Sequence, residues 1–144
     1  MNRMTLEQEI FGKLLVTANQ VQRFGDQVTK PLTLKQWLLT IVLMNLQSEA
    51  PTLNELSKIV GSSRQNVSVM ARKLEEKGYL KLASSSADAR AVHVALTPQG
   101  DSVLRQVETV GNHVLDELFH DIPLQDLQTT MNVVQLLMDR ASSQ

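Results

Sequence analysis

The chain has 144 residues, of which 42% are hydrophobic and 3% aromatic, and its formal net charge is −1. This is the size of one domain, residues 1–144, with a hydrophobic core of its own. The absence of cysteine excludes disulfides and thiol catalysis, and no apolar run approaches the ~18 residues that a membrane span needs. We therefore expect a cytoplasmic protein that has no membrane segment and needs no cofactor.

The charge is unevenly distributed along the chain. Residues 1–57 carry five Lys or Arg and five Asp or Glu, residues 58–90 carry seven and three, and residues 91–144 carry two and seven. The three segments therefore have net charges of 0, +4 and −5. A basic middle segment leaves one face able to meet an anionic partner, although the whole chain is slightly acidic.

Residues 5–28 are predicted to form one long amphipathic helix. Apolar residues recur there at three-, four- and seven-residue steps from Leu6 to Val28, and Lys30-Pro31 ends the pattern. Thr33 is the predicted N-cap of a second helix. The apolar stripe of this second helix is expected to face the core and comprises Leu34, Trp37, Leu38, Ile41 and either Val42 or Leu46.

Two short helices are predicted around a Gly-Ser turn. Thr52 and Glu55 form a capping-box pattern that begins a helix over residues 52–60, whose buried side comprises Leu53, Leu56, Ile59 and Val60. Gly61 ends this helix, and Ser62 or Ser63 caps the next one, over residues 63–77. The buried face of the next helix comprises Val67, Met70, Ala71 and Leu74.

The opposite face of the helix over residues 63–77 is rich in side chains that can read DNA bases. Arg can bond guanine through two N–H groups, Gln or Asn can bond adenine, and small Ser and Val side chains can meet a phosphate or a thymine methyl group. The amides at the helix start can also hold a phosphate. The predicted DNA-contacting residues are Ser62, Ser63, Arg64, Gln65, Asn66, Ser68, Val69, Arg72 and Lys73.

Two alternating segments, residues 79–82 and 91–96, predict a β-hairpin over residues 79–96. A hairpin that follows a helix-turn-helix is a wing. The linker between its strands carries Asp88 and Arg90, and an Arg at a wing tip is suited to the narrow, negative minor groove, with Asp88 able to orient it. The alternative interpretation of this pair is an ordinary solvated loop.

The last part of the chain is predicted to form two more helices. Pro98 can begin a helix with the apolar residues Val103, Val107, Val110, Val114, Leu118 and Phe119. After Ile122-Pro123 a last helix presents Leu124, Leu127, Met131, Val134 and Leu137 or Met138. The apolar stripes over residues 5–28 and 98–140 exceed what a winged helix can cover, so we expect them to form a dimer interface; the alternative is an intramolecular bundle.

The run from Leu53 to Gly100 resembles the winged helix of the MarR family of bacterial transcriptional regulators. The resemblance is carried by residues 60–68, by residues 74–80, and by Asp88-x-Arg90 followed by Leu96-Thr97-x-x-Gly100. It implies a mainly α fold with a small β-hairpin wing, in which a winged helix over residues 33–97 is flanked by dimerisation helices. It also implies a homodimer that binds a double-stranded DNA operator in the bacterial cytoplasm. Repression is the simpler expectation, because occluding polymerase needs only occupancy.

The wing departs from the usual pattern of that family. Leu82, Ala83 and Ala89 stand where relatives often carry Arg. Each phosphate contact that is lost makes the salt dependence of log K shallower by about 0.9. DNA binding is therefore expected to depend on the helix over residues 63–77 and on Arg90.

The same resemblance implies a small amphipathic or aromatic effector bound between the dimer helices and the winged helix. The predicted cleft residues are Phe11, Leu15, Trp37, Ile41 and Met44, which the alternative interpretation places in the core. A metal-responsive regulator is a second alternative, because His113, Glu117 and His120 follow helical steps of four and three. Helical residues of these types are more often solvated surface.

Two other classes of function are alternatives to DNA binding. An enzyme is disfavoured, because the chain has no cysteine, no phosphate-cradling Gly loop and no plausible Ser-His-Asp order. A winged helix adapted to protein interaction is consistent with the weakly basic wing and the overall acidity. A protein-binding helix would be expected to expose a more apolar face than the one predicted over residues 64–73.

Overall fold

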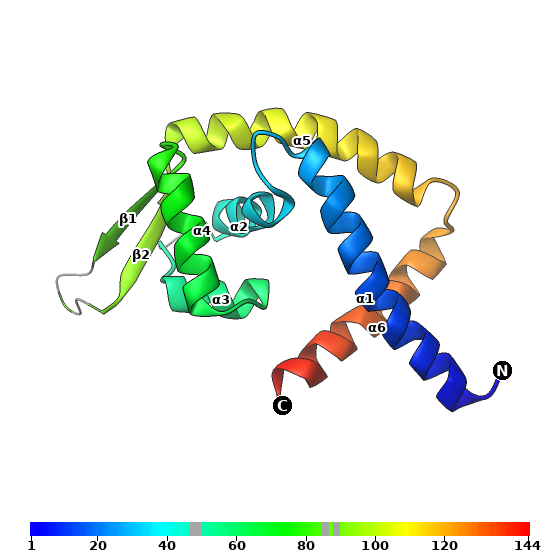
Figure 1. Ribbon diagram of the computed structural model, residues 1–144. Helices are drawn as coiled ribbons and strands as arrows, with labels where there is room; N and C mark the ends of the chain where they lie inside the picture. The colour runs from blue at the N-terminus through cyan, green and yellow to red at the C-terminus, as the bar shows by residue number, and fades with distance from the viewer. Residues whose placement is uncertain (47–49, 85–86, 88–89) are drawn as a thin grey trace. The chain divides into compact units, whose positions relative to one another are not determined.

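The structure is a computed structural model that describes residues 1–46, 50–84, 87 and 90–144 (Figure 1). Its elements are α1 (Arg3–Val28), α2 (Leu34–Asn45), α3 (Leu53–Val60), α4 (Arg64–Glu76), β1 (Leu80–Ser84), β2 (Val92–Leu96), α5 (Pro98–Phe119) and α6 (Leu124–Ser142). The chain divides into two compact units, Met1–Gly111 and Asn112–Gln144. A mainly helical fold with one two-stranded hairpin confirms the predicted fold class.

The turn between α3 and α4 is built by the residues that the sequence indicated. Thr52 Oγ1 accepts the Glu55 N–H at 3.1 Å and the Glu55 carboxylate accepts the Thr52 N–H at 3.2 Å, which completes the capping box. Gly61 ends α3 with φ 67°, in the left-handed region where glycine is favoured. Ser63 caps α4 by accepting the Asn66 N–H at 3.1 Å. These local features fix where α3 begins and ends and where α4 begins.

The core of the unit Met1–Gly111 lies where α2, α3, α4 and the hairpin meet. From α4 it receives Val67, Ala71 and Leu74, each 0% exposed, as predicted. Ile59 of α3 was predicted to be buried, but it is 49% exposed. The buried apolar residues of the core are Leu32, Leu39, Leu43, Leu53, Leu56, Val67, Ala71, Leu74, Leu80, Val94 and Val107.

Helix α2 buries a different face from the predicted one. Thr33 caps it with a complete capping box, as expected, but its buried residues are Gln36, Leu39, Thr40 and Leu43. Leu38 of the predicted stripe is 41% exposed, and Leu46, the alternative to Val42 in that stripe, is 38% exposed, whereas Trp37 and Val42 are partly buried against the core. The predicted stripe was wrong because most positions of α2 are apolar, so that periodicity selects no unique face.

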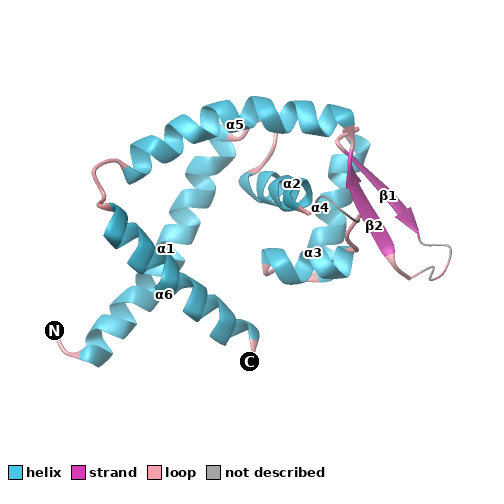
Figure 2. Cartoon of the chain, turned by 180° about the vertical axis from the view of Figure 1, so that it is seen from behind, coloured by secondary structure: helices cyan, strands magenta, loops and turns pink. Residues whose placement is uncertain are grey.

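The two strands form one antiparallel hairpin beside α4 (Figure 2, magenta). Leu80 pairs with Leu96, and Leu82 pairs with Val94. Leu80 and Val94 are buried in the core, so the inner face of the hairpin base is part of the hydrophobic packing. Both strands lie within the predicted wing over residues 79–96, and β1 extends beyond the predicted strand, residues 79–82, to Ser84.

The sequence Leu96-Thr97-x-x-Gly100, which begins at the last residue of β2, links three neighbouring segments of the chain. Thr97 Oγ1 donates to the Gly78 carbonyl at 2.6 Å and accepts the Gly100 N–H at 3.0 Å. The Thr97 N–H donates to the Tyr79 carbonyl at 3.0 Å. One threonine therefore joins the end of α4, the beginning of β1 and the first turn of α5.

Helices α1 and α6 bury very little within one chain. Gly25 is the only buried residue of α1, and α6 has none. Several large apolar residues of each helix are exposed: Met4, Leu6, Ile10, Phe11, Leu14, Leu15, Val16, Val21 and Phe24 of α1, and Leu124, Met131, Val133, Leu136, Leu137 and Met138 of α6. In the described part of the chain, no helix is both long enough and apolar enough to span a membrane.

Candidate nucleic-acid interface

The outer face of α4 is fixed by what the helix buries. Because Val67, Ala71 and Leu74 face the core, and successive residues are rotated by roughly 100°, the opposite side presents Gln65, Val69 and Arg72 on consecutive turns. The side chains of α4 that were predicted to contact DNA are exposed, except the partly buried Ser68; the exposed ones are Arg64, Gln65, Asn66, Val69, Arg72 and Lys73. Among the residues before the helix, Ser63 is exposed and Ser62 is partly buried.

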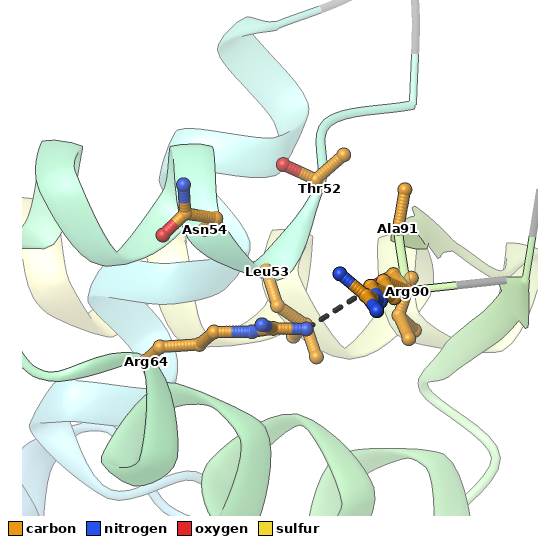
Figure 3. Close-up of a pocket in the computed structure, with 7 residues that line it drawn as sticks. Thr52, Leu53, Asn54, Arg64, Arg90 and Ala91 are labelled. Carbon is orange, nitrogen blue, oxygen red and sulfur yellow. Dashed lines mark hydrogen bonds between the residues drawn. The ribbon is translucent and has the colours of Figure 1, made fainter. Parts of the chain in front are cut away.

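Arg64, the first residue of α4, is bonded to the wing. Its Nη2 donates to the backbone carbonyl of Arg90 at 3.0 Å, a contact between residues 26 positions apart (Figure 3). Arg90 lies in the linker between the two strands, two residues before β2 begins. We call this contact the Arg64 clasp. It directs the Arg64 guanidinium toward the hairpin rather than along the outer face of α4.

Glu75 makes a second contact between α4 and the wing, near the other end of the helix. Its Oε2 accepts the Leu82 N–H of β1 at 2.7 Å. Leu82 is paired with Val94 on β2, and its N–H points to the outer edge of β1, where it meets the carboxylate. The wing is therefore attached to α4 through two hydrogen bonds that begin about three helical turns apart on this helix.

The outer edge of β2 is attached to the segment that leads into α3. The Val94 N–H donates to the Pro51 carbonyl at 2.9 Å, and Thr52 forms an isolated antiparallel bridge with His93. The Nδ1 atom of His93 lies 2.8 Å from the Ala50 carbonyl oxygen. The hairpin is thus held along the outer edges of both strands.

A cavity of about 310 Å³ lies where the start of α3, the start of α4 and the beginning of β2 come together (Figure 3). Two of its lining side chains, Arg64 and Arg90, are cationic. The residues that line it are Thr52, Leu53, Asn54, Arg64, Arg90, Ala91 and Val92. Two guanidinium groups beside the N-terminus of a helix give this cavity a chemistry that favours an anionic group.

The predicted wing pair is described only in part. Asp88 and Ala89 lie outside the described residues, so the orientation of Arg90 by Asp88 stays a prediction. Arg90 is exposed, and its backbone carbonyl is the acceptor of the Arg64 clasp. The position of Arg90 beside the start of α4 is consistent with a role in the same interface.

The five predicted cleft residues lie on α1 and α2 and differ in burial. Phe11 and Leu15 are 70% and 58% exposed, whereas Trp37, Ile41 and Met44 are partly buried. The indole Nε1 of Trp37 is enclosed, and it is the one buried side-chain nitrogen or oxygen that has no hydrogen-bond partner among the described residues. Such a donor is costly to leave unpaired.

The structure does not bring the candidate metal ligands together. His113 Nε2 lies 3.5 Å from Glu117 Oε1, and His120 Nε2 lies 3.2 Å from Asp121 Oδ2. Within the described ranges, no group of three or more His, Asp or Glu residues is placed to hold a metal ion. His113, Glu117 and His120 therefore give no support to a metal-responsive regulator.

Sequence reasoning missed the two contacts that position the wing. It assigned Arg64 to base reading, and it gave Glu75 no role. The acceptor of the Arg64 clasp is a backbone carbonyl, and the donor to Glu75 is a backbone amide. Since every residue carries such groups, no side-chain pattern could have indicated either partner.

A short helix, a tight turn and an exposed polar helix, followed by a hairpin packed beside them, define a winged helix-turn-helix, which is a DNA-binding class of protein. Residues 32–91 match the sequence pattern of the MarR family. Over this stretch the chain is similar to the MarR family of transcriptional regulators. This is a family of regulators rather than enzymes.

Comparison with individual proteins agrees with this assignment. The chain is 30% identical over 104 residues to the transcriptional repressor MprA of Escherichia coli K12, a match that covers 72% of this chain and 59% of MprA. An organohalide-sensing transcriptional regulator, solved in its 2,4-dichlorophenol-bound form, superposes with a TM-score of 0.82 at 16% identity, over 99% of this chain and 86% of that one. The Mycobacterium tuberculosis regulator MosR, solved in complex with DNA, superposes with a TM-score of 0.78 at 20% identity, over 91% and 94%.

Proposed function

We propose that this protein is a transcriptional repressor that binds a pseudo-palindromic double-stranded DNA operator as a homodimer. The observation that carries the proposal is the outer face of α4, which is exposed, polar and basic and has the wing attached beside it. In this arrangement α4 enters the major groove, while Arg90 reaches the backbone or the minor groove beside it. A DNA phosphate occupies the cavity lined by Arg64 and Arg90.

The homodimer is supported by the exposed apolar faces of α1 and α6. Monomeric proteins rarely leave large apolar patches in contact with water, and obligate dimer interfaces are rich in such residues. The partner we propose is a second copy of this chain, because a symmetric dimer presents two copies of α4 to two half-sites. MprA, the relative that is 30% identical, is a transcriptional repressor, which supports the same mode of action.

A small-molecule effector is proposed to bind between α1 and α2. The unpaired Nε1–H of Trp37 supports this, because an effector carboxylate or hydroxyl oxygen would satisfy a donor that the described residues leave without an acceptor. The apolar rings and chains of Phe11, Leu15, Ile41 and Met44 would contact the body of an aromatic ligand. The effector would weaken DNA binding only if it binds more tightly to a form in which the two α4 helices do not fit the operator.

The proposal is tested by selecting bound sequences from a pool of random DNA duplexes, followed by footprinting of the selected site. Protection of two half-sites about 10 base pairs apart is expected for a symmetric dimer. Arg90→Ala is expected to bind the selected operator more weakly and to make the dependence of log K on log salt shallower by about 0.9. Lys30→Ala, which changes an exposed cation far from α4 in sequence, is the control and should leave affinity unchanged.

A failure to select any DNA duplex from the random pool would contradict the proposed function. If no sequence is enriched and no duplex is protected at low salt, DNA binding is excluded. The winged-helix protein-interaction module then becomes the better interpretation. If the parent and Arg90→Ala bind the operator equally, the wing has no part in DNA binding, whereas the role of α4 stands.

A further inference from the structure

We propose that Val69 contacts the C5-methyl group of a thymine, so that each operator half-site has an A·T base pair opposite the middle of α4. This inference rests on the proposed DNA binding and goes beyond it by naming a base. The other side chains of the outer face are polar or charged, and each can serve more than one base or a phosphate. Val69 can make only an apolar contact, which restricts its partner.

Val69 is placed where a base-reading side chain must be. It is 50% exposed and lies across the helix axis from the buried face of α4. Within α4, all of which is described, it is the one large apolar residue with such exposure. Met70, the next residue, is partly buried against the core. The exposure of Val69 is therefore a property of its position and does not reflect loose packing of the helix.

Folding gives no reason for a valine at this position. Valine is a poorer helix former than Ala, Gln or Lys, because the preceding turn restricts its branched side chain. Its methyl groups are not part of the hydrophobic core. A single exposed apolar residue is common on protein surfaces, but this one lies between Gln65 and Arg72, one turn away in either direction, on the face proposed to meet DNA.

The chemistry of the major groove identifies the partner. The edges of base pairs present hydrogen-bond donors and acceptors there, and the C5-methyl of thymine is the apolar group. Placed against any other base, Val69 would cover polar atoms without bonding them, which is unfavourable. Placed against thymine, its methyl groups meet a methyl group. Gln65, one turn earlier, is suited to bond an adenine nearby.

The surroundings favour DNA over a protein as the partner of Val69. Arg72 and Lys73 are exposed beside it, and the apolar area that one valine offers is far below the several hundred Å² typical of a protein-binding patch. Cations around one small apolar group match a groove in which phosphates flank a methyl group.

The test removes the thymine methyl group without changing base pairing. The operator is the duplex selected by the full-length protein, and each thymine of its half-site is replaced in turn by deoxyuridine, symmetrically in both half-sites. Binding is measured by fluorescence anisotropy for the parent protein, for Val69→Ala, and for Ile59→Ala. Ile59 is the matched control, because it is an apolar residue of similar exposure, 49%, on α3.

For the parent we expect one thymine in each half-site whose methyl group contributes to binding. Loss of that methyl group should weaken binding about fourfold per half-site, because burial of one methyl or methylene group stabilises a complex by about that factor. Val69→Ala should bind the thymine operator more weakly than the parent. Deoxyuridine at that position should reduce the affinity of Val69→Ala less than it reduces the affinity of the parent. Ile59→Ala should show the profile of the parent. Thermal unfolding of each variant verifies that the fold is kept.

Two results would overturn the inference while the proposed function stands. One is binding by the parent that is insensitive to deoxyuridine at every thymine. The other is an equal loss of affinity, for the parent and for Val69→Ala, when deoxyuridine replaces thymine at the sensitive position. Failure of the full-length protein to select any duplex would instead overturn the proposed function, and the thymine contact with it.

Discussion

The sequence predicts that Arg64 reads a base, whereas in the structure Arg64 supports the wing. The structure shows its Nη2 donating to the Arg90 carbonyl at 3.0 Å, so its guanidinium is used in positioning the hairpin. A base-reading residue determines which operator is bound. A supporting residue determines how tightly every operator is bound, because it fixes the wing before DNA arrives.

Substitution of Arg64 separates the two roles. Arg64→Lys keeps the positive charge but lacks the planar group that reaches the carbonyl, and Arg64→Met removes the charge as well. We expect both variants to bind the operator about two- to tenfold more weakly, as loss of one hydrogen bond implies, with the base preferences of the parent. Only Arg64→Met should also show a shallower salt dependence. A changed preference at one base pair in a repeated selection would show that Arg64 reads that base.

Gly100 shows how closely two segments approach at the start of α5. A Cβ atom at Gly100 would overlap the backbone carbonyl oxygen of Tyr79, and a backbone atom cannot move aside as a flexible side chain can. We expect Gly100→Ala to lower the free energy of unfolding by about 1–3 kcal/mol, the range for overpacking. Chemical denaturation at a fixed protein concentration measures this change.

Gly111 is the matched control for Gly100, because it lies on the same helix. A Cβ atom there would meet nothing within 4 Å in the described chain. Gly111→Ala should leave the free energy of unfolding unchanged or raise it by up to about 1 kcal/mol, since alanine is the better helix former. Equal destabilisation by the two variants would contradict the steric explanation.

At the scale of the elements, the wing is held by contacts made at its edges as well as by its buried face. Glu75 accepts the Leu82 N–H, and Pro51 accepts the Val94 N–H. A two-stranded hairpin is at best marginally stable by itself. Its orientation relative to α4 therefore depends on these side contacts and on the packing of Leu80 and Val94.

Glu75→Ala is expected to loosen β1 without unfolding the protein. Amide hydrogen exchange at Leu82 should become about five- to tenfold faster, because the N–H loses its acceptor. Glu75→Gln keeps an acceptor oxygen and should restore much of the protection. Glu76→Ala changes the neighbouring exposed carboxylate, and it should leave exchange at Leu82 as in the parent.

The sequence predicted those elements whose signals are local. The capping box of Thr52 and Glu55, the glycine at residue 61 and the apolar spacing of α4 act within a few residues, and each is present as predicted. The buried face of α2 was not predicted, because a helix that is apolar on most sides is oriented only by its tertiary neighbours. The attachment of the wing was not predicted, because its bonds use backbone groups of distant residues.

At the scale of the whole molecule, the exposed apolar residues of α6 are those that we propose to be buried in the homodimer. Met131 is 63% exposed near the middle of this helix. We expect Met131→Glu to weaken dimerisation at least about tenfold, because a charge would be buried without a partner. Analytical ultracentrifugation across a concentration series measures the dissociation constant.

Thr130→Glu is the control for this substitution. It places the same charge on the adjacent residue of α6, which is exposed and rotated away from Met131. It should remain a dimer at concentrations at which Met131→Glu dissociates. A parent protein that sediments as a monomer at every concentration would contradict the proposed homodimer, although DNA binding by α4 would still need its own test.

The contacts at the outer edges of the hairpin have a further consequence for the protein at high concentration. A short hairpin with open edges can be extended by a strand from another molecule, which is how sheets recruit neighbours into aggregates. In this protein the Leu82 N–H on one edge and the Val94 N–H on the other are already bonded, to Glu75 and to Pro51. The same bonds that position the wing beside α4 therefore also protect its strands against strand addition, which keeps the hairpins of neighbouring molecules apart.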